Sequence, residues 1–281
     1  MTSSASSRAP AVLLLPGLCS TPDELMHVQS ALRRAGCAVA TPHIRGYSFD
    51  PAQRVQRASA FGAWIDAVAA EAQALRRAHG RVLLAGISAG ASLALAAGQT
   101  LGGAVDGLVL MSTTLRTDGW AVARGRWLLP LALYTPLGRL WRYREKPPYG
   151  VKNERVREWI ARELETRRIS RAGCAAIGVP HLREYDRLRR TVRRALHRVE
   201  CPVLALHARE DEVASLANLD LLARGLVRAP LRTVVLDNSY HMISIDNDRR
   251  RVAQETVAFA AGMAALPASL PAPGRPGPSP S

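Results

Sequence analysis

The chain has 281 residues, of which 48% are hydrophobic, so it is long enough for one large domain with a substantial core. It carries 38 Lys and Arg against 23 Asp and Glu, a formal net charge of +15. Because 36 of the 38 cations are Arg in an Ala-rich chain, the skew is what a GC-rich genome produces, and we do not expect nucleic acid as a partner.

The amino-terminal segment, residues 1–10, is Ser-rich and is expected to be disordered. It lacks the features of a signal peptide, so we expect a cytoplasmic protein. The apolar run at residues 11–15 follows. It is continuous, as in a strand buried on both faces, and far too short to span a membrane.

Strand-like and helical segments alternate beyond this first strand. Thr21-Pro22-Asp23-Glu24 predicts a helix start with a capping box, and that helix is expected to end near Gly36. Apolar spacing predicts a second helix within residues 57–79. Alternation of this kind predicts an α/β fold with a mostly parallel sheet and helices on both faces. The further strands are expected at residues 37–41, 82–85, 105–111, 203–206 and 233–236.

The alternation breaks between residues 113 and 199, where amphipathic helical patterns prevail. We therefore predict a helical cap there, inserted into a core formed by residues 11–112 and 200–264. Residues 116–200 hold 21 basic and 9 acidic side chains, so 21 − 9 = +12 of the net charge lies in this segment. A Pro/Gly-rich tail, residues 265–281, is expected to be disordered.

An apolar run within the cap, from Trp127 to Tyr134 and on to Trp141, has two interpretations. It packs the cap onto the core, or it lines an acyl site or touches a lipid surface, since Trp and Arg beside apolar residues suit an interface.

The sequence Gly-Ile-Ser-Ala-Gly at residues 86–90 stands between an expected strand and an expected helix. This is the arrangement of a nucleophile elbow, in which a strained turn exposes Ser88 and leaves no room for side chains at Gly86 and Gly90. Alone, the five-residue pattern also fits a glycine-rich turn with an incidental serine.

A nucleophilic serine needs a histidine as general base and a carboxylate to orient it. His241 follows the strand expected at residues 233–236 through a short polar loop, and Asp211 follows the strand at 203–206. Both strand ends meet Ser88 at one edge of a parallel sheet. The competing carboxylates are Glu210, Glu212 and Asp237, and His207 is expected to anchor a loop.

The tetrahedral intermediate of acyl transfer needs backbone N–H donors held in place beforehand. We expect one from Ala89, at a helix N-terminus, and one from Leu18, in the loop after the first strand. No motif predicts a metal site or a cofactor, and the spacing of the four cysteines indicates reduced thiols.

Taken together, these elements resemble the α/β-hydrolase superfamily, and within it the bacterial carboxylesterase and monoacylglycerol lipase group. The resemblance spans roughly residues 12–261 and rests on Leu-Leu-Leu-Pro-Gly-Leu, Gly-Ile-Ser-Ala-Gly, Ala-Arg-Glu-Asp-Glu and Asn-Ser-Tyr-His-Met-Ile. It implies hydrolysis of small carboxylic esters of short-to-medium acyl length through an acyl-enzyme, with Ser88 as nucleophile, Asp211 as orienter and His241 as base.

Two residues depart from the family pattern. Pro16 stands where a histidine is usual before the first oxyanion donor, and Tyr240 stands where glycine is favoured before the catalytic histidine. A bulky Tyr240 is expected to narrow the site or alter its loop. The alternatives are therefore a lipase or thioesterase on the same scaffold, or a catalytically silent member whose basic cap binds an anionic partner.

Overall fold

The computed structural model describes residues 9–53, 55–136, 138, 142–166, 169–170 and 173–265. Of the segments expected to be disordered, residues 1–8 and 266–281 lie outside the described residues, as do residues 137 and 139–141 of the apolar run in the cap. Residue 265 is the last residue of a helix.

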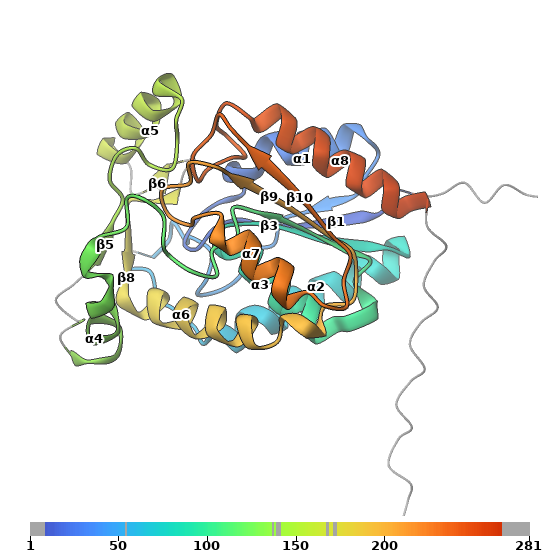
Figure 1. Cartoon of the computed structure of the whole chain (residues 1–281), viewed down its shortest axis with the longest axis horizontal. Helices are drawn as coiled ribbons and strands as arrows, with labels where there is room; N and C mark the ends of the chain where they lie inside the picture. Colours follow the sequence, from blue (N-terminus) through green and yellow to red (C-terminus); the bar gives the residue numbers. More distant parts are fainter. Residues whose placement is uncertain are drawn as a thin grey trace, which may run out of the picture.

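A six-stranded sheet forms the centre of the molecule, with strand order β10-β9-β4-β3-β1-β2 and every neighbouring pair parallel (Figure 1). The predicted α/β fold is thereby confirmed. The strands begin and end close to the apolar runs that predicted them, and the bounds are β1 Ala11–Leu15, β2 Val39–Ala40, β3 Val82–Ile87, β4 Gly107–Met111, β9 Val203–Ala208 and β10 Leu231–Leu236.

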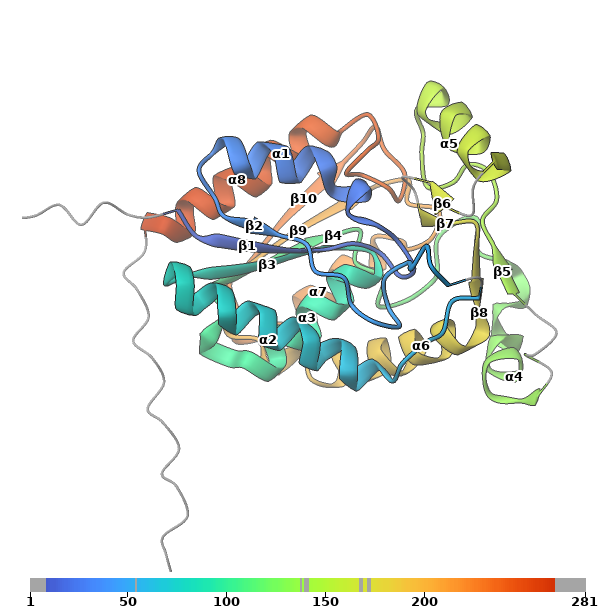
Figure 2. The same ribbon diagram turned by 180° about the vertical axis from the view of Figure 1, so that it is seen from behind.

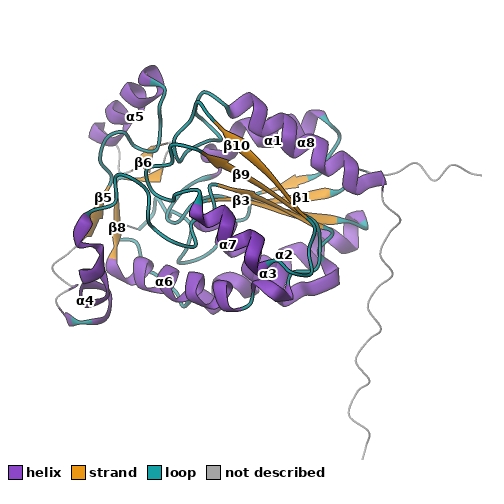
Figure 3. Cartoon of the chain, viewed as in Figure 1, coloured by secondary structure: helices purple, strands orange, loops and turns teal. Residues whose placement is uncertain are grey.

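Helices cover both faces of this sheet (Figures 2 and 3). Leu13 and Leu15 pack in a core with the helices of one face, and Val12 and Leu14 pack in a second core on the other. Burial on both faces explains why the strands are continuous apolar runs. One face carries α2 Phe61–His79, α3 Ala89–Leu101, α6 Val179–Arg194 and α7 Ala217–Gly225, and the other carries α1 Met26–Arg34 and α8 Arg249–Ala265.

The chain between β4 and β9 contains helices α4 Leu129–Tyr134, α5 Glu154–Thr166 and α6. It also forms two small antiparallel ladders, one joining β5 Arg142–Arg144 to β8 Ala176–Gly178 and one joining β6 Ile169–Ser170 to β7 Gly173–Cys174. Helices α4 and α5 stand beyond the carboxyl edge of the sheet (Figure 1), whereas α6 lies along α3, with Gln99 Nε2 donating to the Val192 carbonyl at 3.0 Å. No helix in the described part of the chain is long and apolar enough to cross a bilayer.

The first helix does not begin with the predicted capping box. Residues Pro22–Leu25 form a short 3₁₀ helix, and the Thr21 side chain makes no capping hydrogen bond. The Glu24 carboxyl bonds instead to the Gly17 N–H at 2.7 Å. The Glu24 carboxyl thus bonds to the loop after β1 and not to the backbone of its own helix start, because the fold places the Gly17 N–H within its reach.

Candidate active site

Ser88 lies in the sharp turn between β3 and α3, where its backbone angles are φ +56° and ψ −116°. The turn leaves no space at either flanking glycine. A Cβ on Gly86 would lie 2.3 Å from the Gly90 carbonyl carbon, and one on Gly90 would lie 2.0 Å from the Leu15 carbonyl oxygen. The strained backbone presents the half-buried Ser88 hydroxyl at the carboxyl edge of the sheet.

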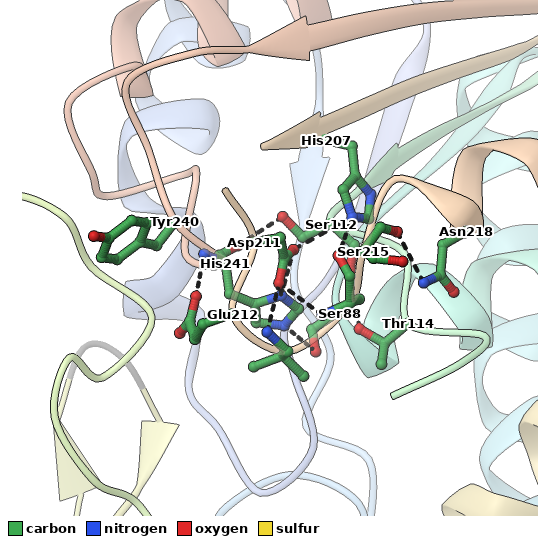
Figure 4. A network of polar contacts seen from close by, with 12 residues as sticks. Ser88, Ser112, Thr114, His207, Asp211, Glu212, Ser215, Asn218, Tyr240 and His241 are labelled. Atoms are coloured by element: carbon green, nitrogen blue, oxygen red, sulfur yellow. Dashed lines mark hydrogen bonds and ion pairs between the residues drawn. The ribbon is translucent and has the colours of Figure 1, made fainter. Parts of the chain in front are cut away.

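Three side chains from separate loops are hydrogen-bonded in series at this edge (Figure 4). The Ser88 hydroxyl lies 2.9 Å from His241 Nε2. His241 Nδ1 lies 2.8 Å from Asp211 Oδ2 and 3.0 Å from Oδ1. The carboxylate fixes the proton on Nδ1, so Nε2 is free to accept the serine proton. The structure thus brings together the three side chains that the sequence singled out.

Asp211 is held by its own loop. Its Oδ1 accepts the backbone N–H groups of Val213 and Ala214, both at 2.8 Å. Burial would raise the pKa of Asp211, but the charge and hydrogen bond of His241 hold it below its usual value. His207 donates from Nε2 to the Ala214 carbonyl at 2.7 Å, and this nitrogen lies 3.4 Å from Asp211 Oδ2. His207 therefore fixes the Asp211 loop.

The competing carboxylates have other partners. Glu210 pairs with Lys152 at 3.0 Å, and Asp237 pairs with Arg209 at 2.7 Å, both pairs being exposed to solvent. Glu212 is buried, and its Oε2 accepts the backbone N–H of His241 at 3.0 Å. It therefore holds the backbone of the histidine and not its ring.

Buried carboxyl groups set the charge state of His241. Burial by itself lowers the pKa of an imidazole, but Asp211, through charge and hydrogen bond, and then the charges of Glu212 and Glu145 raise the pKa of His241 to about 9. Burial in turn raises the pKa of Glu212, and it raises that of Glu145 to about 7. The buried carboxyl groups therefore favour the imidazolium form of His241.

The two backbone N–H groups expected to form the oxyanion hole lie in neighbouring segments of the chain. Ala89 is the first residue of α3, and Leu18 lies in the loop after β1. These loops touch, since a Cβ on Gly90 would lie 2.4 Å from the Pro16 carbonyl oxygen. Within the described residues, neither the Leu18 nor the Ala89 N–H donates a hydrogen bond. Neither N–H is therefore occupied by a contact within this part of the protein.

Pro16 and Tyr240 are each accommodated by local contacts. The Pro16 carbonyl accepts the Tyr47 hydroxyl at 2.7 Å. The Tyr240 ring packs edge-on against Trp120 at 5.6 Å, and Lys152 Nζ lies 5.7 Å from its centre. Figure 4 shows the Tyr240 ring turned away from Ser88. Of the two effects expected of Tyr240, narrowing the site or altering its loop, the first does not occur, because the ring packs against Trp120 on the side away from Ser88.

Three side chains support the site in roles that the sequence did not indicate. The Ser112 hydroxyl donates to the His241 carbonyl at 2.6 Å, Glu212 accepts the His241 N–H, and Glu24 accepts the Gly17 N–H. In the sequence, Glu212 stands only as a competing carboxylate beside Asp211. In the sequence, a buried carboxyl looks the same as a solvated one, so none of these roles carried a signal.

The parallel sheet, the nucleophile elbow and the Ser88–His241–Asp211 series define an α/β-hydrolase. Residues 6–248 match the family described as serine aminopeptidase, S33, and the chain belongs to this family. The predicted resemblance to the α/β-hydrolase superfamily and its carboxylesterase and monoacylglycerol lipase group is confirmed.

Several characterised proteins are similar to the chain. A thermostable monoacylglycerol lipase of Bacillus sp. (strain H-257) is 25% identical over 250 residues, covering 88% of this chain and 89% of that enzyme. A structure from work on two metagenome-derived lipolytic enzymes, LipS and LipT, superposes with a TM-score of 0.73 at 22% identity, covering 90% of this chain and 94% of the other. The monoacylglycerol lipase of Paleococcus ferrophilus gives 0.72 at 16% identity, with the same coverage.

Proposed function

We propose that the chain is a serine esterase that hydrolyses carboxylic esters of short-to-medium acyl length through an acyl-enzyme. The proposal is supported above all by the unbroken hydrogen-bond series from Asp211 through His241 to Ser88, next to two unused N–H donors. Ser88 acts as the nucleophile, His241 as the general base and Asp211 as its orienting partner.

In the first half of the reaction, His241 Nε2 takes the Ser88 proton while Oγ attacks the ester carbonyl carbon. The N–H groups of Leu18 and Ala89 hold the oxyanion, and the dipole of α3 favours its charge. His241 then gives the proton to the alkoxide that leaves. In the second half, His241 activates a water that releases the acid from Ser88.

Glycerol monoesters are the second candidate substrate class, because the Bacillus relative and one of the similar structures are monoacylglycerol lipases. A panel of ester substrates tests which of these two substrate classes the enzyme prefers. It contains p-nitrophenyl esters from acetate to palmitate and monoacylglycerols of the same acyl lengths. We expect the highest kcat/KM on the short-to-medium p-nitrophenyl esters. A rise in rate with every added carbon would instead indicate a lipase.

A fluorophosphonate probe tests whether the chain is a serine hydrolase at all. We expect the folded wild-type protein to be labelled on Ser88 and the Ser88→Ala variant to stay unlabelled. A folded protein that takes no label would show that the chain is catalytically silent. Running the ester panel on both proteins assigns the turnover to the same serine.

We also propose that the cap touches an anionic lipid surface. Four apolar side chains of the cap, at positions 127, 128, 131 and 134, are 41–74% exposed. Two of the cations nearby, Arg187 and Arg190, lie within 5.9 Å of the Tyr134 ring centre. Apolar side chains next to arginines suit the boundary between lipid headgroups and acyl chains.

A further inference from the structure

The Glu24 carboxyl is an acid buried next to the candidate oxyanion loop, and the catalytic scheme does not use it. The residue is only 3% exposed, and its Oε2 accepts the Gly17 N–H at 2.7 Å. A Cβ on Gly17 would lie 3.2 Å from the same oxygen, so the carboxyl lies directly against this residue. Removing a carboxyl group from water costs free energy, so a buried carboxyl bonded to a loop backbone indicates a role for that contact.

The contacts of Gly17 fix the direction of the neighbouring Leu18 N–H. Glu24 holds the Gly17 N–H, and the Gly17 carbonyl accepts the Ser20 N–H at 3.3 Å. In a trans peptide the N–H points opposite to the preceding carbonyl. Anchoring Gly17 at both its nitrogen and its oxygen therefore aims the Leu18 N–H away from the turn. The next residue, Cys19, is held by its N–H bond to the Tyr47 carbonyl at 2.9 Å.

Glu24 is also tied to the loop that carries His241. The Ser244 hydroxyl, three residues after His241, donates to the Glu24 carbonyl at 2.6 Å. Burial raises the pKa of Glu24 to about 7, and the nearby Ser20 side chain, the Gly17 N–H and, least of the three, the charge of His241 act to lower it. One residue thus links the oxyanion loop to the base.

We propose that Glu24 is a positioning residue for the oxyanion hole, and that its side-chain oxygen holds Gly17 so that the Leu18 N–H points at the oxyanion. This inference rests on the proposed function. The role requires a hydrogen-bond acceptor and not a negative charge. The Glu24 contact matters when negative charge develops on the substrate oxygen in the transition state. Its loss should therefore lower kcat more than it raises KM.

Two variants of nearly the same size separate the acceptor from the bulk of the side chain. Glu24→Gln keeps an oxygen for the Gly17 N–H, and Glu24→Met fills the same space with only a weakly accepting sulfur. Asp23→Ala is the control, because Asp23 is exposed in the same turn. With a p-nitrophenyl butyrate substrate we expect Glu24→Met to lose at least about tenfold in kcat with KM changed less than about twofold.

Glu24→Gln is expected to stay within about threefold of wild-type kcat, since a neutral amide oxygen replaces the acceptor. Asp23→Ala is expected to match the wild type. The proposal is overturned if Glu24→Met keeps wild-type kcat, if its loss falls on KM, or if Glu24→Gln loses as much as Glu24→Met.

Amide hydrogen exchange tests the contact without any turnover. In the wild type we expect the Gly17 N–H to exchange much more slowly than the Leu18 N–H, and Glu24→Met to abolish this protection while Glu24→Gln preserves it. An unprotected Gly17 in the wild type would overturn the proposal even if the variants do not fold. Wild-type protein with a protected Gly17 but no labelling of Ser88 would refute the proposed function and leave the Glu24 contact established.

Discussion

At the scale of single residues, the proposed chemistry depends on the protonation state of His241. Only the neutral imidazole can accept the Ser88 proton. Asp211, Glu212 and Glu145 oppose the effect of burial and raise the pKa of His241 to about 9. The negative charges that stabilise the imidazolium during the reaction therefore also reduce the fraction of His241 that is neutral at pH 7.

We expect kcat/KM for p-nitrophenyl butyrate to rise with pH, with a midpoint near pH 9 and a plateau above it. Glu212→Gln removes a negative charge that favours the imidazolium, so the pKa of His241 falls and the midpoint moves to lower pH. The amide oxygen still accepts the His241 N–H. Glu210→Gln, at an exposed position, is the control. An unshifted midpoint in Glu212→Gln would contradict this account, and Ser88→Ala supplies the blank for spontaneous hydrolysis.

A second prediction concerns the orienting carboxylate. Asp211→Asn keeps the shape of the side chain but favours the wrong tautomer of His241, so kcat should fall by about 10³–10⁴-fold. Asp237→Asn, at the exposed rival position in the His241 loop, should change kcat less than about twofold. Equal losses in both variants, measured with the same ester, would argue against Asp211 as the partner of His241.

At the scale of elements, the turn from β3 into α3 depends on two glycines with no space for a side chain. Gly90→Ala would push a Cβ to 2.0 Å from the Leu15 carbonyl oxygen, at the end of the buried strand β1. We expect unfolding in urea to show a loss of at least about 2 kcal/mol, together with a loss of labelling at Ser88.

The control for Gly90→Ala is Gly262→Ala, in helix α8. A Cβ there meets nothing within 4 Å, so the change should be neutral or should stabilise the protein by up to about 1 kcal/mol. If Gly90→Ala and Gly262→Ala had the same free energy of unfolding, the inference that α3 packs tightly against the end of β1 would be wrong.

The elements differ in how well the sequence predicted them. The runs that became β1, β3 and β9 were found nearly to the residue, because burial on both faces leaves a continuous apolar signature. The first helical turn begins where it was predicted, with Thr21 as N-cap and Pro22 as its first residue, but the predicted capping box was wrong. The pattern of Thr21 and Glu24 satisfies the capping-box rule, but a contact with Gly17, seven residues earlier, takes the carboxyl instead. Local rules cannot anticipate a partner that the fold supplies.

At the scale of the whole molecule, the meeting of Ser88, Asp211 and His241 at one edge of the sheet was predictable, because parallel strands bring their carboxyl ends to the same edge. The direction in which a side chain points at that edge could not be predicted from the sequence. Tyr240 was expected to crowd the site, yet it turns outward onto Trp120. The roles of Glu24, Glu212 and Ser112 were not predicted because they arise from backbone groups that meet only in the folded chain.

The distribution of charge and exposed apolar surface leads to the last prediction. Trp127 is 74% exposed and Leu131 is 52% exposed on the cap, within the sequence region that holds most of the net charge. We expect the protein to float with vesicles containing phosphatidylglycerol and to bind pure phosphatidylcholine weakly, because each arginine near an anionic surface contributes about 1 kcal/mol. High salt should release it.

The double change Trp127→Ala and Leu131→Ala should reduce vesicle binding at least about tenfold, because burial of the two side chains in the acyl boundary is lost. Its turnover of a water-soluble ester should stay near the wild-type value, since neither residue contacts the Ser88–His241–Asp211 series. Val227→Ala, at a residue 71% exposed in the loop after α7, is the control. Equal flotation of the double variant and the wild type would show that the arginines act without the apolar side chains, and that the cap does not enter the lipid.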